Sequence, residues 1–332
     1  MTKVKFRISK KAIVNILLRW EAILFYIFII VIIFNSYISP YFLDIINLFD
    51  TTFNFMEKAI IALPMIFIII CGDIDISVAS TIALCSVFMG LASSMGVDTP
   101  GLIAIGLITG TFAGFVNGII ITKLKISAIA VTIGTYSLYR GIPYVILGDK
   151  AFTQYPESFA YLGQGYLGNT IIPFQLVFFI FMAIIFGIIL HKTTYGRKLF
   201  AIGNNSTCAK FSGVNVNRIR LYNFMLAGLC AGIASILLTS RIGSTRPNIA
   251  SGWELEIITS VVLGGVSIMG GVGNIFGVII AVFLLGIMKF GMGIINLPGK
   301  VMNIMTGSLL IIAIMLPVYI KQLKNKIILK KT

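Results

Sequence analysis

Long apolar runs alternate with short polar segments along the whole chain. Most of these runs approach the length that an α-helix needs to cross the hydrocarbon core of a bilayer, about 20 apolar residues. The pattern therefore predicts an all-α polytopic membrane protein with a single transmembrane domain over residues 1–332 and about ten crossings. The second and eighth crossings are short, and each adjoins a polar segment that contains glycine. The ten predicted crossings are 22–38, 59–71, 78–95, 102–121, 126–147, 171–190, 221–240, 257–269, 275–295 and 301–319.

The distribution of lysine and arginine predicts how the chain is oriented in the membrane. Most of these residues fall in segments that the ten crossings place on one side, and positive charge is enriched on the cytoplasmic side of membrane proteins. The few others, Lys58 and Arg241 among them, fall in predicted outer loops. Both termini should therefore be cytoplasmic. The three segments expected in the cytoplasm are the basic N-terminus at 1–20, the loop at 191–220 and the basic tail at 320–332.

Composition supports the membrane assignment and limits what the charge can mean. The chain is 58% hydrophobic and 11% charged, which leaves too few charges to cover a water-soluble protein of 332 residues. Its formal net charge of +15 sits in the segments that set topology. The sequence therefore predicts contact with a lipid bilayer and no nucleic-acid partner.

A polar segment, Gly72–Ser80, interrupts two apolar runs and carries Asp73 and Asp75. Carboxylates are costly in lipid, so both should face a cavity or neighbouring helices. Glycine and short acidic residues between two apolar halves also suit a broken helix, and such breaks line paths enclosed by protein. The alternative is that the two aspartates only brace helix ends.

A weak internal similarity suggests an inverted repeat. Placing Gly72 on Gly252 aligns Ser80 with Ser260, while the two aspartates correspond loosely to two glutamates after Gly252. The predicted topology sends the third crossing outward and the eighth inward, as an inverted repeat with a site between its halves requires. The candidate residues of a substrate pathway are therefore Asp73, Asp75, Ser77, Glu254 and Glu256.

Two long loops are candidate docking surfaces. The predicted inner loop is polar and contains a segment, 206–211, that can form a short helix with Ser206 as its N-cap and Gly213 as its stop. Such a helix offers a contact for a cytoplasmic protein, although the loop can also be a basic connector. The predicted outer loop at 148–170 is either a solvated cap or a surface for an external partner.

The chain lacks the motifs of the common catalytic sites. It has no glycine-rich phosphate loop closed by Lys-Ser or Lys-Thr, no HExxH and no GxSxG. Its single histidine, His191, cannot build a zinc site, and its four cysteines have no ligand-like spacing. We expect no catalytic residue, metal or cofactor in this chain. Arg140 and Lys289 either snorkel or pair with an acid, and each is also a pathway candidate.

The polar segment Gly72–Ser80 resembles the GGIDLSVGS signature of ribose-type ABC sugar permeases, which belong to the simple-sugar, branched-chain-type family. The resemblance continues in AIGNN at 201–205, FSGVNVNR at 211–218 and SVVLGGVSIMGGVG at 260–273. It covers the chain from about residue 55 to 318 in family order. The stretch TFNFMEKAIIALP at 52–64 is most similar to rhamnose-type permeases, and autoinducer-2 permeases are also similar there.

This resemblance implies the fold and partners of a type II ABC importer in the bacterial cytoplasmic (inner) membrane. Family members have about ten spans and pair with a second permease copy or a homologous permease. They also work with ABC ATPase subunits that bind ATP-Mg and with an extracytoplasmic sugar-binding protein. The family's coupling helix matches the inner loop, which implies that the ATPase contacts are Asn205, Ala209, Lys210, Phe211 and Gly213.

The resemblance favours import of a monosaccharide, with rhamnose as the first expectation. An autoinducer-2 or ribose-type permease of the same family is the nearest alternative. An ion-coupled secondary transporter that uses Asp73 and Asp75 as carriers is a rival from another class. A partner subunit that makes no contact with the sugar is a further one.

Overall fold

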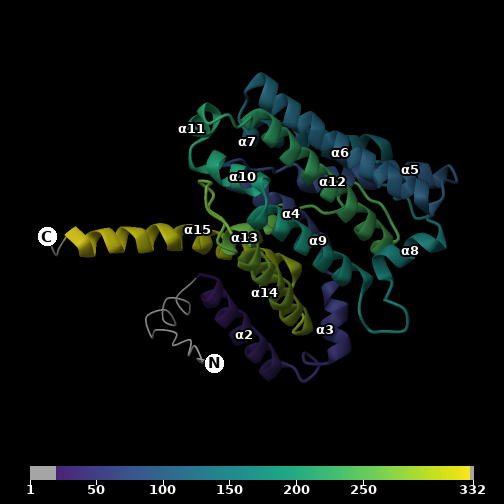
Figure 1. Ribbon diagram of the computed structural model, residues 1–332. Coiled ribbons are helices and arrows are strands. Elements are labelled where there is room, and N and C mark those ends of the chain that lie inside the picture. Colours follow the sequence, from purple (N-terminus) through teal and green to yellow (C-terminus); the bar gives the residue numbers. More distant parts are fainter. Residues whose placement is uncertain (1–19, 330–332) are drawn as a thin grey trace, which may run out of the picture.

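The computed structural model describes residues 20–329, which form helices joined by loops, with no β-strand among these described residues (Figure 1). Residues 1–19 and 330–332 lie outside the described residues, and with them almost all of the predicted basic N-terminus and the end of the predicted tail. The helices are α2 (Trp20–Ile38), α3 (Ile45–Thr52), α4 (Met56–Ile70), α5 (Val78–Ser94), α6 (Thr99–Leu124), α7 (Ala128–Leu147), α8 (Glu157–Gln164), α9 (Phe174–Lys192), α10 (Thr194–Asn204), α11 (Ser206–Phe211), α12 (Val216–Ile242), α13 (Trp253–Leu263), α14 (Ile275–Ile294) and α15 (Gly299–Leu329).

Every predicted crossing coincides with a helix, but ten membrane spans are not confirmed. Among the described residues, α2, α6, α9, α12 and α14 are long and apolar enough to cross a membrane. The number rises from 5 to 6 if α3 and α4, bent by 51° at their junction, form one broken span. Helices α5 and α13 are shorter, and α7 carries polar residues such as Arg140. Breaks in the chain therefore shorten the helices that the apolar pattern predicted as whole spans.

Helix α4 forms the centre of the protein. All of its residues except Lys58 are buried, and it packs against α12, α9 and α13. A helix that is enclosed on every side has no polar face, which explains why its sequence is an unbroken apolar run from Ala59 to Ile70. Pro64 lies inside the helix without ending it.

Helices α6 and α12 form the most extensive helix pair, and glycines line their contact. A Cβ atom on Gly110 or Gly114 would collide with a backbone carbonyl of α12, and one on Gly228 would collide with the carbonyl of Gly110. Small residues let membrane helices approach until their backbones touch. The α6 stripe repeats every four residues, which places its members on one face: Gly106, Gly110, Gly114 and Gly118.

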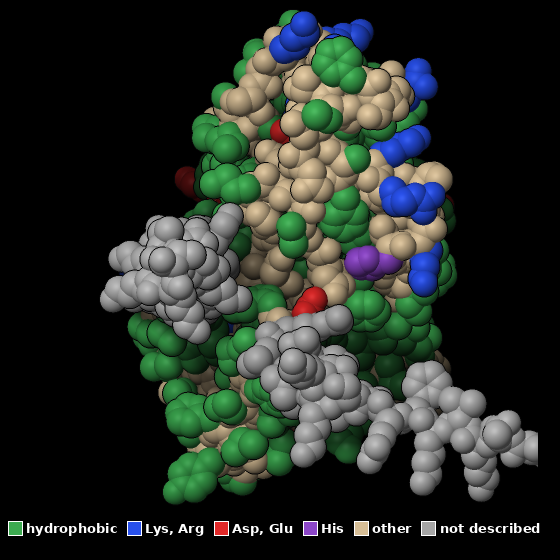
Figure 2. Space-filling model, turned by 60° about the vertical axis from the view of Figure 1, so that its left-hand side comes forward, with side chains coloured by type: hydrophobic (Ala, Val, Ile, Leu, Met, Phe, Trp, Pro, Cys, Tyr) green, Lys and Arg blue, Asp and Glu red, His purple; other side chains and the backbone are tan. Residues whose placement is uncertain are grey.

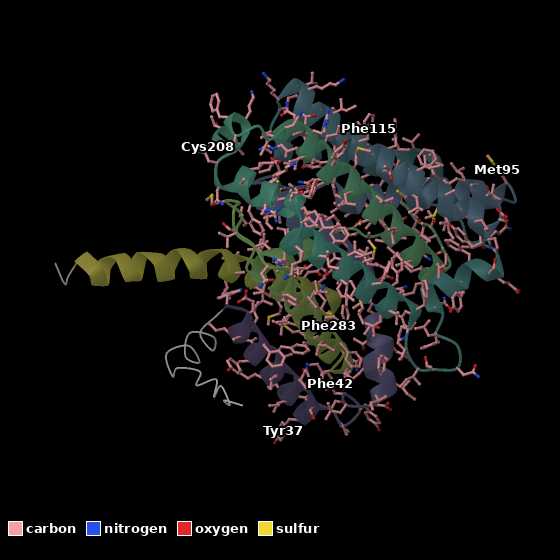
Figure 3. The ribbon with its side chains drawn as sticks, in the orientation of Figure 1. Tyr37, Phe42, Met95, Phe115, Cys208 and Phe283 are labelled. Carbon is pink, nitrogen blue, oxygen red and sulfur yellow. The ribbon has the colours of Figure 1, made fainter. Side chains whose placement is uncertain are left out.

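The two ends of the bundle differ in charge. One end, here called the basic end, carries the C-terminus of α6, helices α10 and α11, and the start of α12, and lysines and arginines gather there (Figure 2). Cys208 on α11 lies at this end, while Met95 after α5 and Tyr37 in α2 lie toward the other (Figure 3). This charge distribution is the one that the predicted topology requires of a cytoplasmic face.

Helix α15 differs from the other long helices in its packing. It contacts α13 and α14 and then extends away from the rest of the protein (Figure 1). Its sequence is largely apolar from Val301 to Ile320 and basic after that. The tenth predicted crossing therefore corresponds to only part of one long helix.

Candidate functional site

The polar segment after α4 is a sharp break between α4 and α5. Gly72 has φ +81°, a left-handed conformation that glycine adopts without strain. The carbonyl of Ile70 accepts a hydrogen bond of 2.9 Å from the amide of Gly271, so the break lies against the glycine-rich connection between α13 and α14. Gly203 in α10 also packs against the carbonyl of Ile70. Three segments that are distant in sequence therefore meet at the basic end.

Asp75 lies inside the protein at this break. Its Oδ1 accepts hydrogen bonds from the amide of Ser77 at 2.9 Å and from the Ser77 hydroxyl at 2.6 Å. Asn117 on α6 donates to the Ser77 Oγ at 2.8 Å, and the Tyr139 hydroxyl on α7 donates to Asn117 at 3.4 Å. A buried carboxyl group is costly unless it has such partners. This chain of hydrogen bonds fixes the break against α6 and α7.

Asp73 borders a cleft at the basic end. Its Oδ2 lies 2.9 Å from Nε of Arg220, which is on the second turn of α12. The cleft has a volume of about 390 Å³, and Lys125 and Asn217 also line it. The cleft contains one acidic and two basic side chains, so it suits a polar solute.

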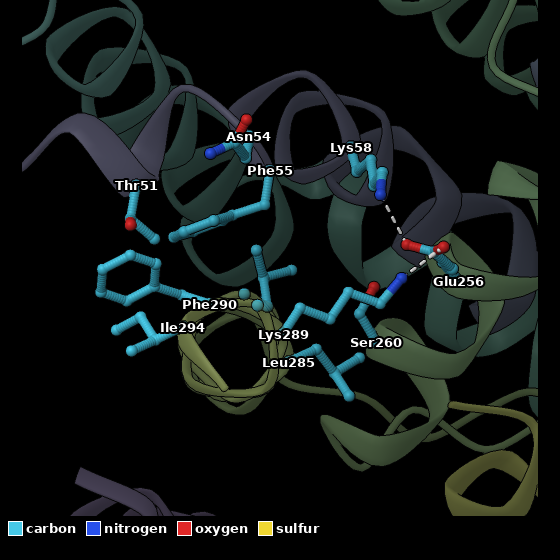
Figure 4. A pocket seen from close by; sticks show the side chains of 13 residues that line it. Thr51, Asn54, Phe55, Lys58, Glu256, Ser260, Leu285, Lys289, Phe290 and Ile294 are labelled. Atoms are coloured by element: carbon cyan, nitrogen blue, oxygen red, sulfur yellow. Dashed lines mark hydrogen bonds and ion pairs between the residues drawn. The ribbon is translucent and has the colours of Figure 1, made fainter. Parts of the chain in front are cut away.

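The two glutamates of α13 have different surroundings. Glu256 forms two ion pairs, with Lys58 of α4 at 2.6 Å and with Lys289 of α14 at 2.5 Å. These three side chains line one end of a pocket of about 420 Å³ (Figure 4). Glu254 is buried, and its Oε2 has no hydrogen-bond partner among the described residues.

The structure does not bring the five predicted pathway residues into one site. Arg220 pairs with Asp73 near the start of α12, whereas Arg241 in its last turn pairs with Glu57 of α4 at 2.7 Å. The two arginines are 21 residues apart, which corresponds to about 32 Å along a helix. Glu256 pairs with Lys58, the neighbour of Glu57, so it belongs to the Arg241 end. Asp73, Asp75 and Ser77 thus form one cluster, and Glu254 and Glu256 lie near the opposite end.

Arg140 links α7 to the segment that precedes α13. Its guanidinium donates to the carbonyls of Pro247 at 3.0 Å, Ile249 at 2.6 Å and Ala79 at 3.2 Å. The residue is buried, so it does not snorkel. Its contacts hold the 243–252 loop, which ends at Gly252 with φ +84°, against the start of α5.

The loop between α9 and α12 contains two helices, α10 and α11, where the sequence predicted one. Asn205, not Ser206, is the N-cap of α11, because its side chain accepts a hydrogen bond of 3.0 Å from the amide of Cys208.

The five predicted ATPase contacts are placed differently along this loop. Ala209 is buried, so its side chain packs within this chain. Lys210 and Phe211 are exposed. Phe211 is 88% exposed to solvent although it is a large apolar residue. Asn205 caps the helix, and Gly213 has φ +83° and ends it. Of the five, only Lys210 and Phe211 are exposed residues within α11 itself.

Sequence reasoning missed the cationic partners of the acidic residues. Lys58 and Arg241, assigned to outer loops, are in α4 and α12, where both form ion pairs. Arg220 was seen only as a loop charge, but it pairs with Asp73. Lys289 is paired rather than snorkelling. The only sequence feature that pointed to these cations was the presence of single basic residues beside apolar runs. This feature does not identify the acidic partner of each one.

Comparison with known proteins places these features in a family context. The family model described as "Branched-chain amino acid transport system / permease component" matches residues 47–314. The autoinducer 2 import system permease protein LsrD of Escherichia coli (strain K12) is 34% identical over 302 residues, which cover 89% of this chain and 91% of LsrD. LsrD of Escherichia coli O157:H7 and LsrD of Shigella flexneri match with the same identity and coverage. No solved structure matches the chain significantly.

Proposed function

Because this chain belongs to the family of branched-chain amino acid transport system permease components, we propose that it is the membrane-spanning subunit of an ATP-binding-cassette importer for a small sugar-like molecule. The observation that carries the proposal is the similarity to LsrD, which extends over 89% of this chain. That range includes the Gly72–Ser77 break, the α10–α11 segment and the pocket at Glu256. The break, the α10–α11 segment and the pocket also lie within residues 47–314, which the family model matches.

Autoinducer 2 is the first candidate for the imported molecule. The relatives named here are autoinducer 2 permeases, which supports the alternative that the sequence offered over its first expectation, rhamnose. Rhamnose rests only on the resemblance of residues 52–64 to rhamnose-type permeases. Ribose is a further candidate of the same chemical class.

A partner ATPase supplies the energy and binds ATP-Mg, and it docks at the basic end, which is cytoplasmic. Support for this docking comes from α11, where Phe211 and Lys210 are exposed at the end that carries most of the positive charge. Aromatic residues are enriched where one protein contacts another. Ala209 and Gly213 contribute by shaping the helix, and Asn205 by capping it.

The Asp73 cleft is the proposed exit of the path at the basic end. It borders the break, and its Asp73–Arg220 pair joins α12 to the end of α4. Asp75 and Ser77 hold the break in place through α6 and α7. The remaining partners are an extracytoplasmic binding protein at the opposite end and a second permease, identical or homologous, in the bacterial inner membrane.

An uptake assay tests this function. Cells without an endogenous importer would express this chain together with its ATPase, binding protein and second permease, and would be given labelled autoinducer 2. We expect uptake that requires both this chain and an ATPase competent for hydrolysis. Unlabelled rhamnose and ribose should not change this uptake. Competition by rhamnose would transfer the substrate assignment to that sugar.

The same assay separates an ABC importer from an ion-coupled transporter. Uptake that persists without ATPase and disappears with an uncoupler would refute the proposal and favour Asp73 and Asp75 as ion carriers. Uptake that depends on ATPase should be abolished by an inactive ATPase. If this chain makes no contact with the sugar, uptake should persist after a second copy of the partner permease replaces it.

A further inference from the structure

The pocket beside Glu256 has the composition of a ligand site rather than of a packing defect. It has a volume of about 420 Å³, which lies in the range of small-molecule sites, about 300–1,000 Å³. Its walls are mostly apolar, and its charged groups gather at one end (Figure 4). Such sites place a few polar groups in an apolar cavity to orient a ligand.

Three charged side chains from three helices form the base of this pocket. Lys58 and Lys289 each contact one oxygen of Glu256, at 2.6 Å and 2.5 Å. The sum of two positive charges and one negative charge leaves the base with a net charge of +1. Each ammonium group has three N–H donors, so donors remain on both lysines after the contact with Glu256. Ser260 lines the same end of the pocket.

The mouth of the pocket lies at the end of the bundle away from the basic end. Asn54 at the α3–α4 turn and Gly293 in the last turn of α14 are exposed and line the pocket. Lys289 lies four residues before Gly293, which is about 6 Å deeper along α14. Phe55 and Phe290 form the walls between the mouth and the base. A ligand that enters here meets aromatic surfaces first and charged groups last.

This arrangement favours a polyhydroxylated molecule over a lipid or a simple anion. A phospholipid with its head group at the mouth would bury its acyl chains against the charged base. Inorganic phosphate is an anion at neutral pH, and the carboxylate of Glu256 would repel it. Hydroxyl groups donate and accept, so they match both the lysines and Glu256. The apolar faces of a small ring can lie against Phe55 and Phe290.

We propose that the pocket between Lys58, Glu256 and Lys289 is a binding site for the imported polyhydroxylated molecule, reached from the end opposite the basic end. The inference rests on the proposed import function, since that function supplies the chemical class of the ligand. The site lies within a single permease chain and is formed by α3, α4, α13 and α14. Its role is to receive the molecule before it moves toward the Asp73 cleft.

Protection of an engineered thiol tests whether the pocket is occupied. The starting variant is Cys208→Ser, because the other three cysteines of the chain are buried. Gly293→Cys places a thiol at the mouth, where an added Cβ meets only the terminal carbon of Met302, at 4.0 Å. Gly299→Cys is the matched control, since it is exposed, meets nothing within 4 Å and does not line the pocket.

The assembled transporter would be reconstituted in vesicles and treated with a water-soluble maleimide in the absence of ATP. At an autoinducer 2 concentration about tenfold above its Kd, labelling at residue 293 should slow about tenfold, because only about one site in eleven remains open. Labelling at residue 299 should not change. Lys289→Met should remove the protection while preserving the Lys58–Glu256 pair, so loss of folding is not the expected cause.

The outcomes distinguish this inference from the proposed function. Vesicles that import with ATP but give equal labelling at residue 293 with and without autoinducer 2 overturn the site and leave the function standing. Protection by inorganic phosphate but not by autoinducer 2, rhamnose or ribose also overturns it, in favour of an anion site. Labelling that is blocked before any addition, and released by delipidation, identifies a lipid as the occupant and refutes the proposal. Absence of uptake with ATP refutes the function itself.

Discussion

Replacing Gly228 by alanine should destabilise the protein more than a single methyl group suggests. Its added Cβ would lie 2.8 Å from the amide nitrogen of Gly114 and 2.9 Å from its Cα, and it would collide with the carbonyl oxygen of Gly110. Ordinary van der Waals contact begins at 3.4 Å. Because these atoms are backbone and not the ends of flexible side chains, no rotamer change can relieve the overlap. The α6 and α12 helices must therefore move apart.

The size of the effect follows from that separation. A displacement of at least about 0.6 Å, the difference between 3.4 Å and 2.8 Å, forfeits a quarter or more of the dispersion attraction of each contact along the pair. Overpacking of this kind costs about 1–3 kcal/mol. For a protein of this size each kcal/mol lowers Tm by about 2–3 °C, so relative to a glycine-to-alanine change in a helix without close contacts we expect a fall of about 2–9 °C.

The assay is the midpoint of thermal aggregation of the purified protein in detergent, measured by size-exclusion chromatography after heating. Gly134→Ala in α7 is the control, because an added Cβ there meets nothing within 4 Å. Alanine favours a helix over glycine by about 1 kcal/mol, so the control should hold or raise the midpoint. Equal midpoints for Gly228→Ala and Gly134→Ala would refute the argument that backbone contact sets the α6–α12 distance.

Three further perturbations follow from the polar contacts. Asp73→Arg and Arg220→Asp should each abolish uptake, because each breaks the ion pair between them. The double exchange should restore part of the uptake. A double variant that is expressed normally but does not import would count against an ion-pair role for Asp73. Arg140→Gln removes a charged donor from three backbone carbonyls and should lower the stability of the protein by about 2–4 kcal/mol. The same heating assay measures this change. An unchanged midpoint would contradict the argument that Arg140 holds the loop before α13. Phe211→Ala should lose co-purification of the ATPase without a change in that midpoint, because its ring is 88% exposed; retained co-purification would exclude this ring from the docking contact.

The apolar pattern predicted where helices lie but not how many cross the membrane. A run of apolar residues has the same appearance in a helix facing lipid and in a helix enclosed by protein. Helix α4 illustrates the difference, since its residues 59–70 are fully apolar because α9, α12 and α13 surround them. Helix α13 is short because it begins only after the 243–252 loop. Arg140 on α7 holds this loop by hydrogen bonds to its carbonyl groups, and no local sequence pattern reveals these bonds.

The candidate site was predicted in part for a similar reason. The cost of placing a carboxylate in lipid correctly indicated that Asp73 and Asp75 face protein or a cleft. Arg220 lies 147 residues after Asp73, and Asn117 lies 40 residues after Ser77, so only the fold reveals these contacts. The internal similarity grouped Glu254 and Glu256 with the aspartates, whereas residues that correspond in an inverted repeat lie at opposite ends of the membrane.

The ion pairs at the two ends of α12 divide the protein into a fixed part and a part with fewer constraints. Asp73 follows α4 and Glu57 begins it, so Arg220 and Arg241 join α12 to both ends of the central helix. The α6 glycine stripe adds a third helix to this unit. Helix α13, by contrast, begins after Gly252 at φ +84° and is followed by glycines in left-handed conformations. Any motion that opens a path is therefore expected at α13 and its flanking glycines, beside both the Glu256 pocket and the contact of α10 with the break.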